Sequence, residues 1–508
     1  MNRTIILFAA LAIASTSAYP AAGPGEQAHA TNDHRSFIPE SFKTLADSIP
    51  PDSTGMDTLS SAALATKMVP GWNLGNTLEA MPNETSWGNP LTTQKLIDSV
   101  KAAGFRSVRI PVAWSKFIAD TSQHIIDTTW LKRVEQVVNY VLNDSMYALV
   151  NEHWDGGWQE PTYADSAYVN HRLSTMWKQI AVHFRDYGDH LLFAGTNEIT
   201  IINYYGTPSK ENFVVQNGFN QAFVNAVRTT GGRNWYRYLA VQGYVTNIDY
   251  TVANFVTPVD VTPGRLMVEV HYYDPYDFTL NTNDKITQWG MYATDASKTE
   301  TWANESYADG EFQKMKANFV DKGFGVLLGE YGATIRTNLG SAALDTSYEK
   351  YRRYYTQYVT RSMERHHIVP FYWDIGAYGD HGSGIFDRNT GAHVWPDILD
   401  AVVDTNSVSP VLGVREEPSA PAGFYLGQNY PNPFNPATMI RYQLPAAGDV
   451  TLRVYDTLGR EVRTLVHERQ SSGVHEVTFD ASGLASGVYY YRLQKGTSTQ
   501  TRRLLVLK

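Results

Sequence analysis

Between residues 57 and 403, short continuous apolar runs alternate with longer stretches in which apolar residues recur at helical spacing. Continuous apolar runs are typical of strands that are buried on both faces, and the longer pattern predicts helices that cover them. We interpret eight runs as strands, at 69–75, 107–112, 147–153, 191–198, 237–244, 265–273, 325–332 and 368–376. Helices are predicted between the strands, among them 92–104, 130–145 and 347–367.

Eight strands separated by helices predict an α/β fold with a parallel sheet covered on its outer face. Eight such units within residues 57–403 indicate a (β/α)8 TIM barrel. The carboxyl ends of the strands of such a barrel meet on one face, where active sites are built.

Polar and aromatic residues gather at the carboxyl ends of these runs. In strand order they are Asn76, Arg109, His153, Asn197, Glu198, His271, Tyr273, Glu330 and Trp373. If the barrel closes, residues spread over nearly 300 positions converge in one pocket. We therefore expect Glu198 and Glu330 to face each other there.

Two carboxyl groups across a cleft with aromatic residues suit glycoside hydrolysis, which needs one protonated and one ionised carboxyl. Arg109 and the hydroxyl group of Tyr273 would favour a charged Glu330. The pattern places no comparable cation near Glu198, so we expect Glu198 to be the protonated group. Asn197 is placed to bond the 2-hydroxyl of a sugar, and Trp373 offers a flat apolar face for a pyranose ring.

Other chemistries find less support in the sequence. His271 and Glu152 could suggest a metal site, but no HExxH motif or comparably spaced pair occurs, so we predict neither a metal nor a cofactor. The absence of a G-x-S-x-G motif weakens a serine esterase interpretation.

Composition narrows the classes further. The net charge of −9 argues against a nucleic-acid partner, and the absence of cysteine excludes disulfides and thiolate sites. The chain has 12 Trp and 32 Tyr, enough to line a sugar-binding surface as well as the core.

The amino terminus predicts export. Residues 1–18 combine Arg3, an apolar stretch and small residues, which is the pattern of a secretory signal peptide. Residues 19–56 are predicted to be a flexible segment. No other segment is long and apolar enough to span a bilayer, so we expect a secreted or cell-surface protein.

The motifs resemble glycoside hydrolase family 5, the retaining cellulase-type barrels. The resemblance rests on RIPV, NEHWDGGW, GTNE, VHYYDPYDF, GEYG and FYWD, and GWNLGNTLEA is most similar to subfamily 4. It implies that Glu198 is the acid/base and Glu330 the nucleophile, with the remaining residues binding or supporting the substrate. Trp154 and Ile375 depart from the family pattern, at positions where relatives often carry His and Asn.

The carboxyl-terminal part follows a different pattern. After a predicted linker at 404–421, residues 422–508 alternate strictly between apolar and polar over short runs, which predicts an all-β, Ig-like sandwich. Its opening, YPNPFNPATMIRYQLP, and its ending, with GVYYYRLQKG, resemble the sorting domain of type IX secretion substrates of Bacteroidetes-related bacteria. This resemblance implies the type IX machinery as a partner. A carbohydrate-binding module is the alternative, although this segment has no Trp to stack on a glycan.

These features together predict a secreted endo-β-1,4-glucanase that retains anomeric configuration and acts as a monomer on β-glucan polysaccharides. Within the same fold, a xyloglucanase, mixed-linkage glucanase or mannanase is the alternative. From a different class, the chain could be a non-catalytic glycan-binding surface protein, but the two intact glutamates argue against that interpretation.

Overall fold

The computed structural model describes residues 49–403 except 154, 203 and 205, together with residues 424–427, 429 and 434–507. The predicted signal peptide, residues 19–48, the predicted linker and Trp154 therefore lie outside the described residues. The chain divides into two compact units, Met1–Val411 and Leu412–Lys508.

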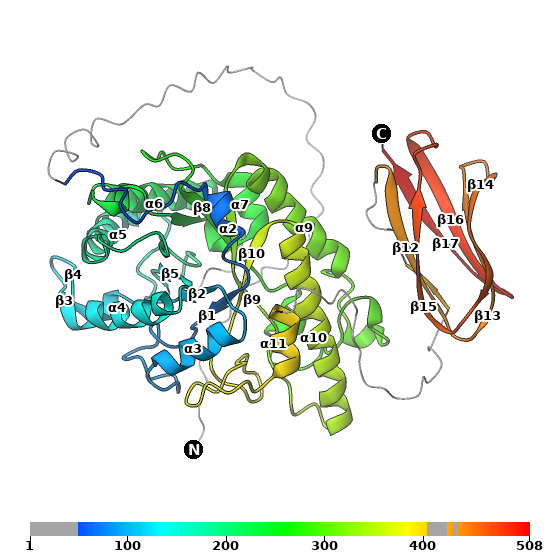
Figure 1. Ribbon diagram of the computed structural model, residues 1–508, viewed down its shortest axis with the longest axis horizontal. Helices are drawn as coiled ribbons and strands as arrows, with labels where there is room; N and C mark the ends of the chain where they lie inside the picture. Colours follow the sequence, from blue (N-terminus) through cyan, green and yellow to red (C-terminus); the bar gives the residue numbers. More distant parts are fainter. Residues whose placement is uncertain are drawn as a thin grey trace. The chain divides into compact units, whose positions relative to one another are not determined.

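Eight parallel strands of the first unit close into a barrel, which confirms the predicted (β/α)8 fold (Figure 1). Each strand lies beside its neighbour in the sequence, and the first strand pairs with the last. The strands are β1 (Gly71–Asn73), β2 (Ser107–Ile110), β5 (Tyr147–Asn151), β6 (Leu191–Ala194), β7 (Leu239–Gln242), β8 (Leu266–Tyr272), β9 (Gly325–Tyr331) and β10 (Ile368–Tyr372).

Helices surround the barrel and cover the outer faces of the strands (Figure 1). They are α3 (Gln94–Ala102), α4 (Thr128–Asn143), α5 (Tyr163–His183), α6 (Lys210–Arg228), α7 (Ile248–Asn254), α9 (Glu305–Asn318), α10 (Ala342–Arg365) and α11 (Pro396–Val403), with a single turn at α8 (Tyr276–Thr279). Side chains cap their first turns, as when the carboxylate of Asp127 accepts a bond from the backbone N–H of Thr129 at 2.7 Å before α4. A short ribbon of β3 (Ile118–Asp120) and β4 (Ile125–Ile126) lies between β2 and α4.

The amino-terminal end of the barrel is closed by α2 (Ser61–Ala65). Leu64 of α2 packs with inward-facing side chains such as Leu149 and Leu327, and all three are fully buried. The hydroxyl group of Ser61 accepts a bond from the N–H of Gly325 at the start of β9. Because this end is filled, only the carboxyl ends of the strands can form a cleft.

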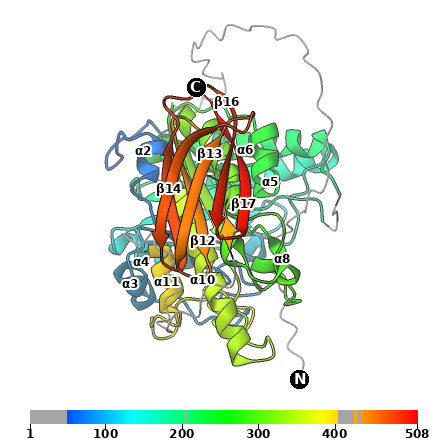
Figure 2. The same ribbon diagram turned by 90° about the vertical axis from the view of Figure 1, so that its right-hand side faces the viewer.

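The second unit is built from two antiparallel sheets, as the alternating pattern predicts. One sheet has the order β11-β12-β15. The other, which faces the viewer in Figure 2, has the order β14-β13-β16-β17. Their bounds are β11 (Tyr425–Leu426), β12 (Ala437–Leu444), β13 (Gly448–Tyr455), β14 (Glu461–Gln470), β15 (Gly473–Asp480), β16 (Gly487–Lys495) and β17 (Ser498–Val506). Alternate residues of β13, such as Val450 and Leu452, are buried in one apolar cluster with Ile440 of the other sheet.

Among the described residues, no helix combines the length and the apolar character that crossing a bilayer requires.

Candidate active site

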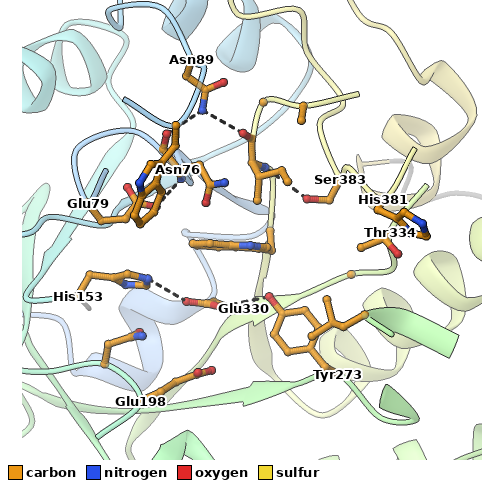
Figure 3. Close-up of a pocket in the computed structure, with 18 of the residues that line it drawn as sticks. Asn76, Glu79, Asn89, His153, Glu198, Tyr273, Glu330, Thr334, His381 and Ser383 are labelled. Carbon is orange, nitrogen blue, oxygen red and sulfur yellow. Dashed lines mark hydrogen bonds and ion pairs between the residues drawn. The ribbon is translucent and has the colours of Figure 1, made fainter. Parts of the chain in front are cut away.

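A cleft of about 800 Å³ opens at the carboxyl ends of the barrel strands (Figure 3). Seven of the nine residues singled out from the sequence line it, namely Asn76, His153, Asn197, Glu198, Tyr273, Glu330 and Trp373. Arg109 and His271 do not line the cleft, but they contact the carboxyl groups that do. The structure thus brings all nine together.

A local irregularity in β9 turns Glu330 toward the cleft. Val270 of β8 pairs with Leu328, but the next residue, His271, pairs with Glu330, so Gly329 is skipped. Such a bulge re-aims the side chain that follows it, and bulges are frequent beside active sites. Here the bulge places Glu330 opposite His271.

The two glutamates predicted to act together are close neighbours. Glu330 is buried in β9, whereas Glu198 follows β6 and is more exposed. One oxygen of each carboxyl group and one nitrogen of His271 lie within 4.8 Å of one another. Retaining glycosidases hold their two carboxyl groups about 5–5.5 Å apart, and inverting ones hold them about 6.5–9.5 Å apart. The observed spacing matches the retaining arrangement.

Arg109 organises the floor of the cleft from a fully buried position in β2. Its Nη1 donates to Glu330 Oε1 at 3.0 Å, and its Nη2 donates to Asn197 Oδ1 at 2.6 Å. Its Nε lies 2.8 Å from Glu269 Oε1. The guanidinium group therefore fixes two carboxylates and the amide that precedes Glu198.

His271 bonds directly to the proposed acid. Its Nδ1 lies 2.7 Å from Glu198 Oε1 and 3.7 Å from Glu330 Oε2. Burial acts to lower the pKa of His271, but the negative charge of Glu330 and bonds to Glu198 and Glu269 outweigh it and raise the pKa to about 9. The expectation that Glu198 has no cation nearby is therefore wrong. The sequence pattern did not reveal this contact, because Glu198 follows β6 and His271 lies in β8, and β7 separates these two strands.

Arg109 and Tyr273 each donate a hydrogen bond to one oxygen of Glu330. The Tyr273 hydroxyl group donates to Glu330 Oε2 at 3.2 Å, and burial beside the two glutamates raises the pKa of Tyr273 well above its usual value, so it remains a donor. Burial also raises the pKa of Glu330, against the opposing charges of His271 and Arg109. These contacts favour the carboxylate form of Glu330 and so oppose the effect of burial.

His153 is a neutral partner on the opposite side of Glu330 (Figure 3). The carbonyl oxygen of the Asn151 side chain accepts from the N–H of Val112, which turns its amide nitrogen toward His153 Nδ1 at 3.1 Å. Nδ1 must then accept, so the proton resides on Nε2, 4.0 Å from Glu330 Oε1. Burial and the charges of Arg109 and His271 lower the pKa of His153 well below its usual value.

Trp373 forms an aromatic wall of the cleft. Its ring stacks on the imidazole of His153, with centroids 5.7 Å apart and planes at 15°. Trp373 is partly exposed toward the cleft, and a Cβ at Gly75 would lie 3.2 Å from the edge of its ring. The ring therefore presents one face that a sugar can cover.

Asn76 lies in a tight turn after β1, with φ of 55°. The carboxylate of Glu79 holds this turn by accepting bonds from the N–H groups of Asn76 and Thr77. Burial raises the pKa of Glu79 to about 7, although these N–H groups oppose the shift. The turn directs Asn76 into the cleft.

Three further aromatic residues belong to this site. Trp87, Tyr204 and Tyr378 line the cleft with 38 %, 44 % and 46 % of their surface exposed. Trp87 is a candidate sugar platform from its residue type alone, whereas Tyr204 and Tyr378 were missed, because they lie in loops, where no periodic pattern marks an orientation. The buried Glu269 was also missed, although its place two residues before His271 on one strand was a usable signal.

Glu198, His271 and Glu330 are the only group among the described residues whose donor atoms are close enough to hold a metal ion. However, an imidazolium has no lone pair to offer, and the Arg109 guanidinium already binds Glu330. The charges present here fit proton transfer better than metal binding.

Comparison with known proteins places this geometry in a family. Residues 73–379 match the family described as Cellulase (glycosyl hydrolase family 5), and residues 428–507 match the Secretion system C-terminal sorting domain. The second match supports export by type IX secretion to the cell surface or the extracellular space, as predicted.

Individual relatives agree with the family match. A xyloglucan-specific endo-β-1,4-glucanase of Bacteroides ovatus is 42 % identical over 356 residues, which cover 68 % of this chain and 70 % of that protein. Endoglucanase A of Paenibacillus barcinonensis is 38 % identical over 368 residues, 68 % of this chain and 90 % of that protein.

Solved structures show the same relationship. The Bacteroides ovatus GH5 xyloglucanase in complex with a XXXG heptasaccharide gives a TM-score of 0.67 at 41 % identity and covers 70 % of this chain and 78 % of that one. A GH5-4 broad specificity endoglucanase from Bacteroides salanitronis gives 0.64 at 38 % identity, with 69 % and 96 % covered. The chain therefore belongs to glycosyl hydrolase family 5, a retaining family of glycoside hydrolases, and carries a secretion sorting domain at its carboxyl terminus.

Proposed function

We propose that this enzyme cleaves internal β-1,4-glucosidic bonds of β-glucans by double displacement, with Glu330 as the nucleophile and Glu198 as the acid/base. The observation that carries the proposal is the pair of carboxyl groups with oxygens within 4.8 Å in an aromatic-lined cleft. The names of the relatives support the substrate class.

In the first step, a carboxylate oxygen of Glu330 attacks the anomeric carbon while Glu198 gives its proton to the departing glycosidic oxygen. The bond to the leaving chain breaks and a glycosyl ester forms on Glu330. In the second step, Glu198 takes a proton from water, and the resulting hydroxide attacks the same carbon and releases Glu330. Two inversions give net retention.

The neighbouring side chains suit these steps. Arg109 occupies the oxygen of the Asn197 amide, so the amide nitrogen is the group left to face the sugar 2-hydroxyl. Trp373 supports the pyranose ring from its exposed face. His153 Nε2–H and the Tyr273 hydroxyl group keep the nucleophile in line and charged.

A xyloglucan preference is the second candidate. It is favoured by the 42 % identity to the xyloglucan-specific enzyme and by a cleft whose rim carries the exposed rings of Trp87, Tyr204 and Tyr378. A wide rim can accommodate xylosyl branches that a narrow tunnel would exclude.

The test is product analysis on carboxymethylcellulose, xyloglucan, mixed-linkage glucan and mannan side by side. We expect new reducing ends from the three glucans, with the β-anomer first in the NMR spectrum of fresh product. Initial formation of the α-anomer would contradict the mechanism. No reducing sugar from any glucan would instead favour a glycan-binding protein without catalysis.

The sandwich at 422–508 is proposed to direct export rather than to bind substrate. We expect its deletion to leave kcat on soluble glucan unchanged and to retain the enzyme in the periplasm. Cell fractionation and an assay of the purified barrel measure the two effects. Normal export with lost binding to insoluble cellulose would show a binding module instead.

A further inference from the structure

Glu269 is a charged residue that the mechanism above does not use. It is fully buried in β8, does not line the cleft, and lies two residues before His271 on the same strand. Its Oε1 is 2.8 Å from Arg109 Nε and 3.5 Å from His271 Nε2. Its Oε2 accepts a bond from the side-chain amide of Gln242 at 2.7 Å.

The backbone of the neighbouring strand makes room for this contact. A Cβ at Gly329 would lie 2.1 Å from Glu269 Oε1 and 2.9 Å from His271 Nε2. Gly329 is also the residue skipped in the pairing of β8 with β9. The glycine that precedes the nucleophile therefore allows a carboxylate and an imidazole to meet beneath it.

Both ring nitrogens of His271 face a carboxyl group, Nδ1 toward Glu198 and Nε2 toward Glu269. A neutral imidazole has only one N–H, so it could not present a proton to both carboxyl groups when Glu198 is ionised, whereas an imidazolium presents one to each. The other titratable and charged groups around this ring are Glu330, Arg109, Tyr273 and His153. Tyr273 and His153 are neutral, so two cations face the carboxylates of Glu269 and Glu330.

We propose that Glu269 is a positioning residue that keeps His271 doubly protonated and thereby holds Glu198 in its acid/base position. The inference rests on the roles proposed above for Glu198 and Glu330. With the charges of Arg109 and His271 balanced by Glu269 and Glu330, Glu198 can keep its proton before the first step. Once Glu330 becomes an ester, one negative charge is lost, and the excess of positive charge favours an ionised Glu198 as the base of the second step.

The pKa values of Glu269 and His271 agree with this assignment. Burial acts to raise the pKa of Glu269, but Arg109 and His271 outweigh it and lower the pKa to about 2. His271 remains charged through neutral pH because its pKa is about 9.

The test replaces Glu269 by Gln, which keeps the shape and removes the charge. We expect the titration midpoint of His271, followed by NMR of the ring nitrogens, to fall by roughly one to three pH units. The alkaline limb of kcat/KM should move to lower pH, because His271 loses its second proton earlier and no longer holds Glu198 in place. A purely structural role would move neither quantity.

Two variants serve as controls. Glu269→Asp keeps the charge and should restore a pH profile closer to that of the wild type. Glu311→Gln changes another buried glutamate, on α9, that pairs with Lys314 away from the cleft, and it should shift neither the profile nor His271. An unchanged His271 midpoint in a folded Glu269→Gln enzyme would overturn the proposal.

If Glu269→Gln does not fold, the wild-type enzyme still tests the proposal, since a His271 midpoint below pH 7 would contradict it. Trapping with a 2-deoxy-2-fluoro glycoside separates this inference from the proposed function. Glu330 should be labelled in the wild type, and labelling elsewhere would contradict the catalytic roles themselves. Labelled Glu330 together with an unshifted His271 would overturn only the role of Glu269.

Discussion

Replacing Glu198 by Gln is expected to slow the hydrolysis of β-glucan polysaccharides by about 10²–10⁴-fold, the usual loss when general acid catalysis is removed. The amide keeps the shape of the carboxyl group and can still accept from His271 Nδ1, which lies 2.7 Å from Glu198 Oε1 in the wild type. It has no acidic proton to give, so the alcohol of a sugar chain leaves slowly. An activated phenolate needs no such proton.

Rapid-mixing measurements with an aryl cellobioside distinguish the two steps. The variant should release one equivalent of phenolate quickly and then stall, because the second step has lost its base. Glu160→Gln is a suitable control, since Glu160 is partly buried but does not line the cleft. An equal loss of rate on polysaccharide and on the aryl substrate would contradict the assignment of Glu198.

Replacing Arg109 by Met is expected to lower the free energy of unfolding by about 3–5 kcal/mol, the typical cost of removing one partner from a buried ion pair. The variant leaves Glu269 and Glu330 buried without the guanidinium group that pairs with both of them. Activity should fall as well, because Asn197 loses the donor that fixes its amide. Urea denaturation followed by tryptophan fluorescence measures the stability.

The loss of unfolding free energy in Arg109→Met is expected to become smaller as pH falls. In the wild type the pKa of Glu269 is lowered from 4.5 to about 2, so the stability from its ion pair is complete at neutral pH and is lost progressively as pH falls from about 4.5 to 2. In the variant the buried carboxyl groups favour protonation, so the difference between the two proteins should narrow in acid. Arg237→Met is the contrasting control, since Arg237 is buried among backbone carbonyl groups, and its loss should not narrow in this way.

The barrel could be predicted because each of its strands is a continuous apolar run, and all eight predicted runs contain an observed strand. The boundaries were less accurate at the carboxyl ends. Residues 191–198 were predicted as one strand, but β6 ends at Ala194. Asn197 and Glu198 lie beyond the ladder, in the loop that follows β6.

The candidate site could be predicted only as a set of residues and not as a network. Position at a strand end identified which side chains meet, since every strand of a parallel barrel delivers its carboxyl end to the same face. It could not show that His271 reaches across β7 to Glu198, because contacts across a barrel interior leave no spacing in the sequence. Glu269 was overlooked because it lies within an otherwise apolar run.

The pairing of the first strand with the last has a consequence for the nascent polypeptide. The indole N–H of Trp72 donates to the carboxylate of Asp374, 302 positions further along the chain. The side-chain amide of Asn73 donates to the carbonyl groups of Phe371 and Tyr372, 298 and 299 positions further along. The pairing of β1 with β10 cannot form until the ribosome has released almost the whole barrel, and contacts of such long range form late in folding. A chain held unfolded during translocation therefore lacks Trp373 in its active site. It becomes able to hydrolyse glucan only when β10 pairs with β1.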